Sequence, residues 1–546
     1  MKRMVQWIGT LLVLVVLVGM LPQAEAAADI RGDLTGDGKV SNDDVLQLLW
    51  CTLFPEDYAT EKQSDLNGDG RVSTDDVLQL LWFTLFPDDY ELLDGFQAGF
   101  GMADITPKAS VPLASYGDSA NRLSVGGYTD LEARCVAIRD GYGQLMLFLV
   151  GDVSWAPNAL GKRVRNDLSA ELGISADYIV ISGTHTHASV DTGLTSMSSV
   201  VDFNNQYVEG MKTAARAAIA DLKPAAVYEG SVTTKGMNFV RRYIMDDGSL
   251  VGDNAYGTGT KIVRHETNAD PELQMLRFVR DGGKDILITN FQAHPHLESK
   301  TKYYSSQTVG AIRDAVEAQL GAHSLHWQGA AGNLNTHSRI GTENIYTSGK
   351  FSEVTRYGQD MVTKYIAPAY DSLTPVAAGA VQVRKVTYTG QVNHQYDNQL
   401  TQAQMVVDYF KSGHTAAESA TYAHKISAQY GLERRINSYY HANRILANAK
   451  LSRTKSMDLV AWSFGDVGGV VLPYEMFDTS GMQMKTQSPF ARTFIVGYSY
   501  PSYTGYIPTE AGYANGGYEA DNSTFAPGAA EGMVANYLQM LEDMHK

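Results

Sequence analysis

Cysteine is scarce in this chain, and its scarcity limits how the fold can be stabilised. The 546 residues contain only two cysteines, Cys51 and Cys135, which the expected boundaries place in different domains. A stabilising disulfide is therefore not expected, and the mature protein must rely on its hydrophobic cores and on bound metals.

Basic residues are also few, and they are outnumbered most strongly near the N-terminus. The net charge is −16, and residues 29–96 hold 16 Asp and Glu against 4 Lys and Arg, a local net charge of −12. Because the acidity is local, it indicates cation binding in that segment and argues against a nucleic-acid partner.

Long apolar runs are missing beyond the first 26 residues, so no later segment is expected to span a membrane. Lys2 and Arg3 precede an apolar run from Ile8 to Leu21, and Ala24-Glu25-Ala26 supplies small residues at a cleavage position. This pattern predicts a signal peptide over residues 1–26 and export from a bacterium, with an uncleaved membrane anchor as the alternative.

The chain is too long to fold around one ordinary hydrophobic core, which indicates two or three domains. Besides the signal peptide, the sequence predicts a small module over residues 29–90 and a large domain over residues 97–546.

An internal repeat of period 32 (65 − 33) defines the small module. Asp33–Trp50 recurs as Asp65–Trp82, and each copy has the ligand spacing of an EF-hand calcium loop followed by an apolar helix. Gly38 and Gly70 stand at the sharp turn. Loop positions 1, 3, 5, 7, 9 and 12 are Asp33, Thr35, Asp37, Lys39, Ser41 and Asp44 in one copy, and Asp65, Asn67, Asp69, Arg71, Ser73 and Asp76 in the other.

Two such units without an entering helix, each with Asp at position 12, resemble a type I dockerin. The resemblance implies a small all-α, EF-hand-like module with two Ca²⁺ ions and a cohesin-bearing scaffoldin as partner. It also implies a secreted protein, extracellular or associated with a cell-surface cellulosome. Asn42-Asp43 and Thr74-Asp75 depart from the Ser/Thr pairs of many dockerins, which leaves the cohesin type open. The alternative is a calcium-stabilised spacer.

Apolar runs separated by helical patterns predict a mixed-sheet α/β fold for the large domain. Tyr178–His187 is predicted to be a buried strand ending in two histidines, His185 and His187, which would share one face. Neutral imidazole is a common metal ligand. Asp152, after a neighbouring strand, would either orient a histidine or cap a helix.

Further candidates follow other buried strands or lie in loops of small residues. His294 ends a strand, whereas His296 is ambiguous. Glu475 follows another strand, as a metal ligand or as a carboxylate at a helix N-terminus. The adjacent pair Arg241 and Arg242 offers donors for an anionic oxygen, although such pairs are more often surface charge.

Five segments, in order, resemble the neutral ceramidases, which are secreted zinc amidases that cleave N-acylsphingosine. They are Gly101–Pro107, Ser182–His187, Ala293–Pro295, Leu472–Glu475 and the Gly505–Glu519 region. The resemblance implies one catalytic Zn²⁺ and an amphiphilic N-acyl lipid substrate. The zinc ligands would be His185, His294, Glu475 and Tyr506, and the catalytic residues His187, Arg241, Tyr506 and Tyr518, with Arg242 as the alternative arginine.

Two departures from the family pattern bear on the substrate. Asn335 stands in a loop where the ceramidases carry a serine, and the chain ends soon after Tyr518, without the family's C-terminal β-sandwich. The sequence leaves the oligomeric state open, as well as the question of whether the substrate is a lipid.

Two alternative functions remain. One is a metal-dependent deacetylase or amidase on plant cell-wall or other acylated substrates, including a barrel amidohydrolase, although the later histidines and aspartate of such barrels are not found. The other is a non-enzymatic, calcium-dependent scaffold or adhesion protein, in which His185 and His294 would be structural.

Overall fold

The computed structural model describes residues 32–546 except 38, 57, 59–63, 67–70, 87–94, 117–118, 253–260, 299 and 501–504. The predicted signal peptide lies outside the described residues, as do Gly38, Gly70, Asn67 and Asp69 of the calcium loops. No helix within the described part of the chain is long and apolar enough to cross a membrane.

The small module contributes two matching helices, α2 (Asn42–Leu53) and α3 (Thr74–Leu85), which pack against each other. The repeated Val-Leu-Gln-Leu-Leu pattern places apolar side chains on one face of each helix, and these faces form a core of their own. The all-α description of the whole module remains a prediction. The core contains Val40, Val45, Leu48, Leu49, Leu66, Val77, Leu80 and Leu81.

The large domain is built on a mixed sheet with the strand order β14-β12-β11-β6-β1-β3-β4-β5. The outer pairs, β14 with β12 and β4 with β5, are parallel, and the pairs between them are antiparallel. The strands are β1 (Gln97–Asp104), β3 (Glu132–Arg139), β4 (Leu145–Gly151), β5 (Ile179–Gly183), β6 (Lys223–Thr233), β11 (Glu272–Arg280), β12 (Ile286–Phe291) and β14 (His323–Gln328).

A second sheet packs face to face on the first. Its order is β17-β18-β19-β21, and its strands are Val381–Gln391, Thr454–Phe464, Val467–Val471 and Arg492–Val496. Phe148 and Trp327 from the first sheet meet Trp462 of the second at ring distances of 4.9 and 5.8 Å. The inner faces of the two sheets therefore form one aromatic core.

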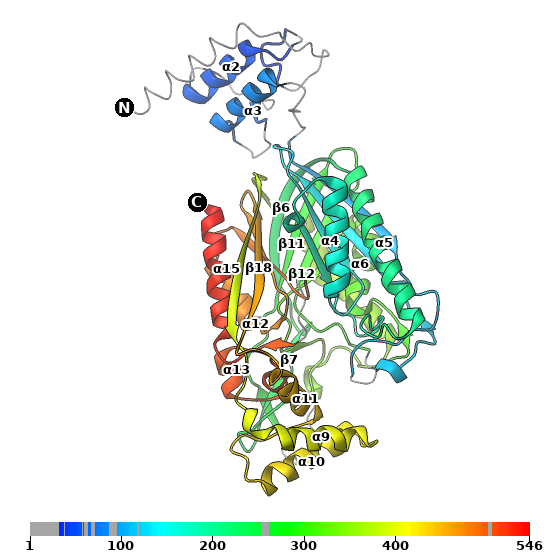
Figure 1. Cartoon of the computed structure of the whole chain (residues 1–546). Helices are drawn as coiled ribbons and strands as arrows, with labels where there is room; N and C mark the ends of the chain where they lie inside the picture. The colour runs from blue at the N-terminus through cyan, green and yellow to red at the C-terminus, as the bar shows by residue number, and fades with distance from the viewer. Residues whose placement is uncertain are drawn as a thin grey trace.

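Helices cover the outer face of each sheet, which gives four layers (Figure 1). The sequence of β4 shows why both faces of the first sheet are buried. Met146, Phe148 and Val150 face the second sheet, whereas Leu147 and Leu149 face the helices. The expected mixed α/β architecture is confirmed. The covering helices are α4 (Asn158–Leu172), α5 (Ser198–Ala220), α6 (Gln307–Leu320) and α7 (Phe351–Met361) on one side, and α12 (Asp478–Gln487) and α15 (Ala529–His545) on the other.

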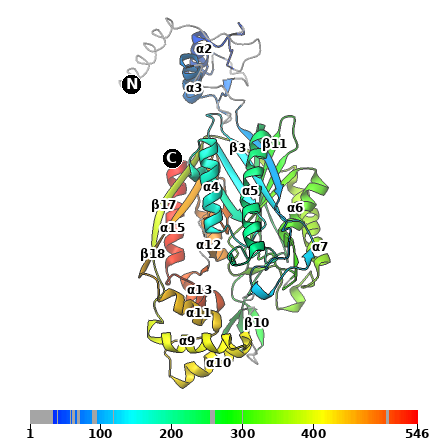
Figure 2. The same cartoon turned by 45° about the vertical axis from the view of Figure 1, so that its right-hand side comes forward.

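The region expected to be a helical layer forms α9 (Leu400–Lys411), α10 (Ala416–Gln429) and α11 (Tyr439–Asn448). These helices share a small core of their own and lie at the end of the molecule away from the N-terminal module (Figures 1 and 2).

The module and the loop that carries His185 and His187, here called the histidine loop, lie at opposite ends of the first sheet. Gln79 of α3 donates a hydrogen bond to the carbonyl of Gly141, in the turn that precedes β4. β4 then runs away from the module for seven residues, about 20 Å at about 3.3 Å per residue. The chain after Gly151 therefore meets the end of β5, from which the histidines follow, far from the module.

Candidate metal centre

The histidines His185 and His187 lie in a loop, not in the strand that the sequence predicts. β5 ends at Gly183, and His185 has a left-handed backbone with φ 62°. The amide of Thr184 donates to Gly151 O and that of His185 to Val153 O, so the loop is held against the end of β4. The two imidazoles share one space because of this turn, and not because of strand alternation.

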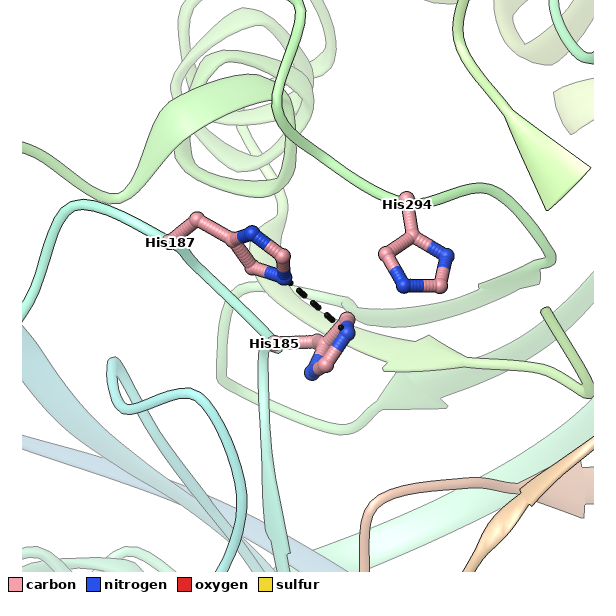
Figure 3. Close-up of side chains that lie close together, drawn as sticks. All are labelled: His185, His187 and His294. Carbon is pink, nitrogen blue, oxygen red and sulfur yellow. Dashed lines mark hydrogen bonds between the residues drawn. The ribbon is translucent and has the colours of Figure 1, made fainter. Parts of the chain in front are cut away.

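Three imidazoles converge on one point. Among the described residues, the ligand nitrogens of His185, His187 and His294 lie within 4.8 Å of one another (Figure 3). The Nε2 atoms of His185 and His187 are 3.2 Å apart. His294 comes from the segment after β12, which a backbone bridge to Asn335 holds in place.

Backbone carbonyls orient two of these rings. His185 Nδ1 is 2.6 Å from Ser154 O, and His294 Nδ1 is 2.9 Å from Ala331 O. A carbonyl accepts but does not donate, so each Nδ1 carries the proton and each Nε2 lone pair faces the cluster. Within the described part of the chain, His294 Nε2 has no hydrogen-bond partner.

Glu475 adds a carboxylate to the imidazoles. Its Oε2 lies 3.2 Å from His294 Nε2 and 3.6 Å from His185 Nε2, and it lacks a hydrogen-bond donor among the described residues. The short parallel pair β20 (Glu475–Met476) and β22 (Tyr506–Ile507) sets Glu475 beside Tyr506, whose hydroxyl is hydrogen-bonded to the carboxyl group.

The electrostatics of the cluster suit a cation. Burial lowers the pKa of His185 to about 3 and holds those of His187 and His294 well below the ordinary value, so all three rings are neutral. Burial raises the pKa of Glu475 to about 7, against the opposing effect of Arg241. Neutral imidazoles and a carboxyl group with one buried, unpaired oxygen fit a bound divalent metal such as zinc.

Arg241 reaches the cluster, whereas Arg242 does not. Nη2 of Arg241 donates to Tyr506 Oη at 3.0 Å and to Gly332 O at 2.8 Å, and Nε donates to Glu519 at 2.9 Å. Arg242 is instead paired with Glu266 and Glu519 and is fully buried. Despite its burial, Glu519 has a lowered pKa because both guanidinium groups face it.

Tyr518 lies beside Tyr506 at the start of α14 (Tyr518–Asp521), with ring centroids 5.6 Å apart. Burial raises the pKa of both phenols, so both are protonated and can donate. All the expected metal ligands and catalytic side chains of the large domain are therefore gathered at one site, although their roles remain proposals.

The small-residue loop before Asn335 packs its backbone closely against the segment that carries Glu475. A Cβ on Gly332 would lie 2.4 Å from Glu475 O, and the amide of Gly332 donates to Met476 O at 2.8 Å. The adjacent Asn333 is bonded through its side chain to Asp478. Asn335 itself is buried in β15 (Leu334–Asn335), beside His294.

Three residues outside the expected ligand and catalytic set also meet the histidines. The ring of Tyr498 stacks on His185 at 3.8 Å, and that of His296 lies 4.7 Å from His187. Gln307 accepts from the amide of His187 at 2.8 Å. His296, at position i+2 from His294, gave a usable signal, but the other two come from distant segments and carry no local pattern.

Asp152 takes neither of the two roles considered for it. Its oxygens accept from both terminal nitrogens of Arg313, at 3.0 and 2.8 Å, and from the amide of Glu132. It is the buried partner of a structural arginine.

The first calcium loop, which the structure describes except for Gly38, is organised around its acidic residues. Oδ1 of Asp44 accepts from the amides of Leu34 and Thr35, and Asp33 accepts from the amides of Gly36 and Asp37. Asp44 and Asp76 also complete matching capping boxes with Ser41 and Ser73.

The fold and the site together define a four-layer α/β protein with a buried histidine, carboxyl and tyrosine cluster, a residue set typical of metal-dependent hydrolases. The model of the neutral/alkaline non-lysosomal ceramidase N-terminal domain matches residues 96–369, half of the chain, and this chain belongs to that family. Residues 31–81 match the type I dockerin domain.

Solved ceramidase structures share the fold. Neutral ceramidase from Pseudomonas aeruginosa superposes with a TM-score of 0.61 at 17% identity, covering 82% of this chain and 74% of that one. A structure described as ceramidase complexed with C2 gives a TM-score of 0.61 at 16% identity, covering 83% and 75%.

Proposed function

We propose that this chain is a zinc-dependent amidase that cleaves the N-acyl bond of ceramide-like lipids. The observation that carries the proposal is the convergence of neutral imidazole nitrogens and the unpaired Glu475 Oε2 at one buried point, in a chain of the ceramidase family. A buried cluster with unsatisfied ligand atoms is costly unless something binds there.

His185, His294, Glu475 and Tyr506 would hold the ion. Bound zinc supplies Lewis acidity toward an amide carbonyl and toward water at neutral pH. His187 is left to move protons: it is neutral, it lies 3.2 Å from His185, and its Nδ1 is buried without a partner among the described residues.

Arg241 and Tyr518 would stabilise the oxyanion that develops on the amide carbonyl. Glu519 and Gly332 O fix the arginine, so its charge is aimed at the site before substrate arrives. Such preorganised donors in a buried site act most strongly where charge appears in the transition state.

The N-terminal module would tether this enzyme to a cohesin. The support is the dockerin match at residues 31–81 together with the calcium-loop spacing. We further propose that residues 1–26 direct secretion, that residues 29–90 form the calcium-binding module, and that residues 97–546 form the hydrolase.

A substrate panel tests the proposal. The full chain, loaded with zinc, is assayed for acid release from ceramides of several chain lengths, N-acyl amino acids and acetylated glycans. We expect fatty acid release from ceramides that a chelator stops and zinc restores. Activity confined to the acetylated glycans would contradict the lipid proposal and favour the second candidate, a cell-wall deacetylase, for which the dockerin match is the specific support.

A further inference from the structure

Two neighbouring segments beside the histidine loop expose large apolar side chains. Leu123, Val125 and Tyr128 of one segment and Tyr303 of the other are 39%, 64%, 45% and 40% exposed. Scattered apolar residues are normal on a surface, but a contiguous group indicates a binding site.

The backbone joins these side chains into one patch. Val125 N donates to Lys302 O and Tyr128 N to Tyr304 O, both at 2.9 Å, and β2 (Gly126–Gly127) pairs with β13 (Tyr303–Tyr304). The centroid of the Tyr128 ring lies 4.7 Å from that of Tyr303 and 4.5 Å from that of Phe351. Phe351 begins α7, which is labelled in Figure 2.

The charge of the patch is opposite to that of the chain. The net charge is −16, yet 122–128 and 300–304 contain Arg122, Lys300 and Lys302 and neither Asp nor Glu. Both lysines are exposed, and Lys350 adjoins Phe351. Exposed Asp130 lies just outside the first segment.

Arg122 connects the patch to the candidate metal centre. Its guanidinium donates to Thr301 O at 3.2 Å and to His187 O at 3.0 Å, and also to Ala114 O. The patch and the loop that carries His187 are therefore held together, at the end of the first sheet away from the small module.

We propose that this patch, comprising Leu123, Val125, Tyr128, Tyr303, Lys300 and Lys302, docks the enzyme on an anionic lipid bilayer. Tyrosine and lysine suit this boundary because each places an apolar body among the lipids and a polar end at the headgroups. Lysines near anionic headgroups add attraction that salt screens. The inference rests on the proposed function, since a two-chain amide substrate would be presented by a bilayer.

Vesicle sedimentation tests the docking surface without depending on catalysis. The full chain is mixed with phosphatidylcholine vesicles that contain about a third phosphatidylserine, and with pure phosphatidylcholine vesicles. We expect the protein to sediment with the anionic vesicles, and about 0.5 M NaCl to release most of it. Lys300→Glu/Lys302→Glu and Leu123→Ser/Val125→Ser should each weaken the partition coefficient by about tenfold or more.

Matched controls use Lys162→Glu on α4, which is exposed, and Val263→Ser, whose side chain is 59% exposed on β10 (Ile262–His265). Both should sediment like the parent. Release of acid from a short-chain, water-soluble ceramide should be unchanged in all four variants.

Each remaining outcome decides between the two proposals. Hydrolysis of the soluble ceramide without sedimentation of the parent would overturn the docking surface and leave the proposed function standing. Sedimentation that the patch variants weaken, without any hydrolysis, would support the surface and count against the function. Equal sedimentation of parent and patch variants, or parent binding to insoluble polysaccharide in place of vesicles, would contradict the docking proposal.

Discussion

At the residue scale, neighbouring arginines of identical chemistry have different surroundings. Arg241 shares its donors between Glu519, Gly332 O and the phenol of Tyr506, whereas Arg242 is paired with two carboxylates. The sequence could not separate them, because the contact that places Arg241 at the site is with Tyr506, more than 200 positions away. Resemblance to a family favoured Arg241, and the contacts show why it is the one near the site.

Arg241→Lys should therefore impair catalysis without loss of the bound zinc. Lysine keeps the charge but loses the planar fork, so we expect kcat/KM for a soluble ceramide to fall by about 100-fold or more, with zinc content unchanged. Arg242→Lys serves as the comparison. It should lower the denaturant midpoint of unfolding, and its loss of kcat/KM should be much smaller than that of Arg241→Lys. Equal effects of the two variants on kcat/KM would contradict the assignment.

At the element scale, buried strands such as β4 (Leu145–Gly151) were predictable because they are continuous apolar runs. The histidine loop was not. Gly183 packs so closely on Val153 O that a Cβ would lie 2.8 Å from it, and His185 then adopts φ 62°. This turn of the chain depends on contacts with the segment that follows β4, and the strand propensity of the residues themselves does not reveal such contacts. Likewise, only resemblance linked Glu475 with Tyr506, and only the fold pairs their strands.

The start of α6 fixes this loop through one side chain. Oε1 of Gln307 accepts from His187 N at 2.8 Å and from Thr186 Oγ1, while its Nε2 donates to Glu298 O. Gln307→Leu keeps the bulk but leaves these groups unpaired, which costs about 1–3 kcal/mol. We expect about a tenfold loss of kcat/KM, measured on a soluble ceramide, and a lower unfolding midpoint.

Gln319→Leu, at an exposed position of the same helix, is the matched control and should leave both values near those of the parent. Parent-like kinetics of Gln307→Leu would show that the loop does not need this contact.

At the scale of the whole molecule, the small module and the candidate site lie at opposite ends of one sheet, so a cohesin on the module would leave the site accessible. The repeat could be interpreted as a calcium module from sequence alone because the expected ligands of each ion lie within one short loop. The metal centre could not be derived in this way, since its residues are spread from His185 to Tyr506 and only the fold unites them.

Cohesin binding by the small module should depend on calcium. We expect EDTA to abolish cohesin binding, measured by calorimetry, and calcium to restore it. Asp44→Ala should lose affinity by at least about tenfold, because the buried Asp44 carboxylate organises the loop, whereas Glu56→Ala, at an exposed position outside both calcium loops, should bind like the parent. Tight binding in EDTA would count against the calcium loops.

The most direct test of the metal centre is the zinc content of the purified full chain after exposure to zinc and extensive dialysis. We expect about one zinc per chain for the parent and for His545→Ala, whose exposed histidine lies at the C-terminus. We expect less than about a tenth of that for His185→Ala and for His294→Ala, because each removes one of the four proposed ligands. Zinc retained by both site variants at the parent level, or a parent without zinc, would contradict the proposed metal centre.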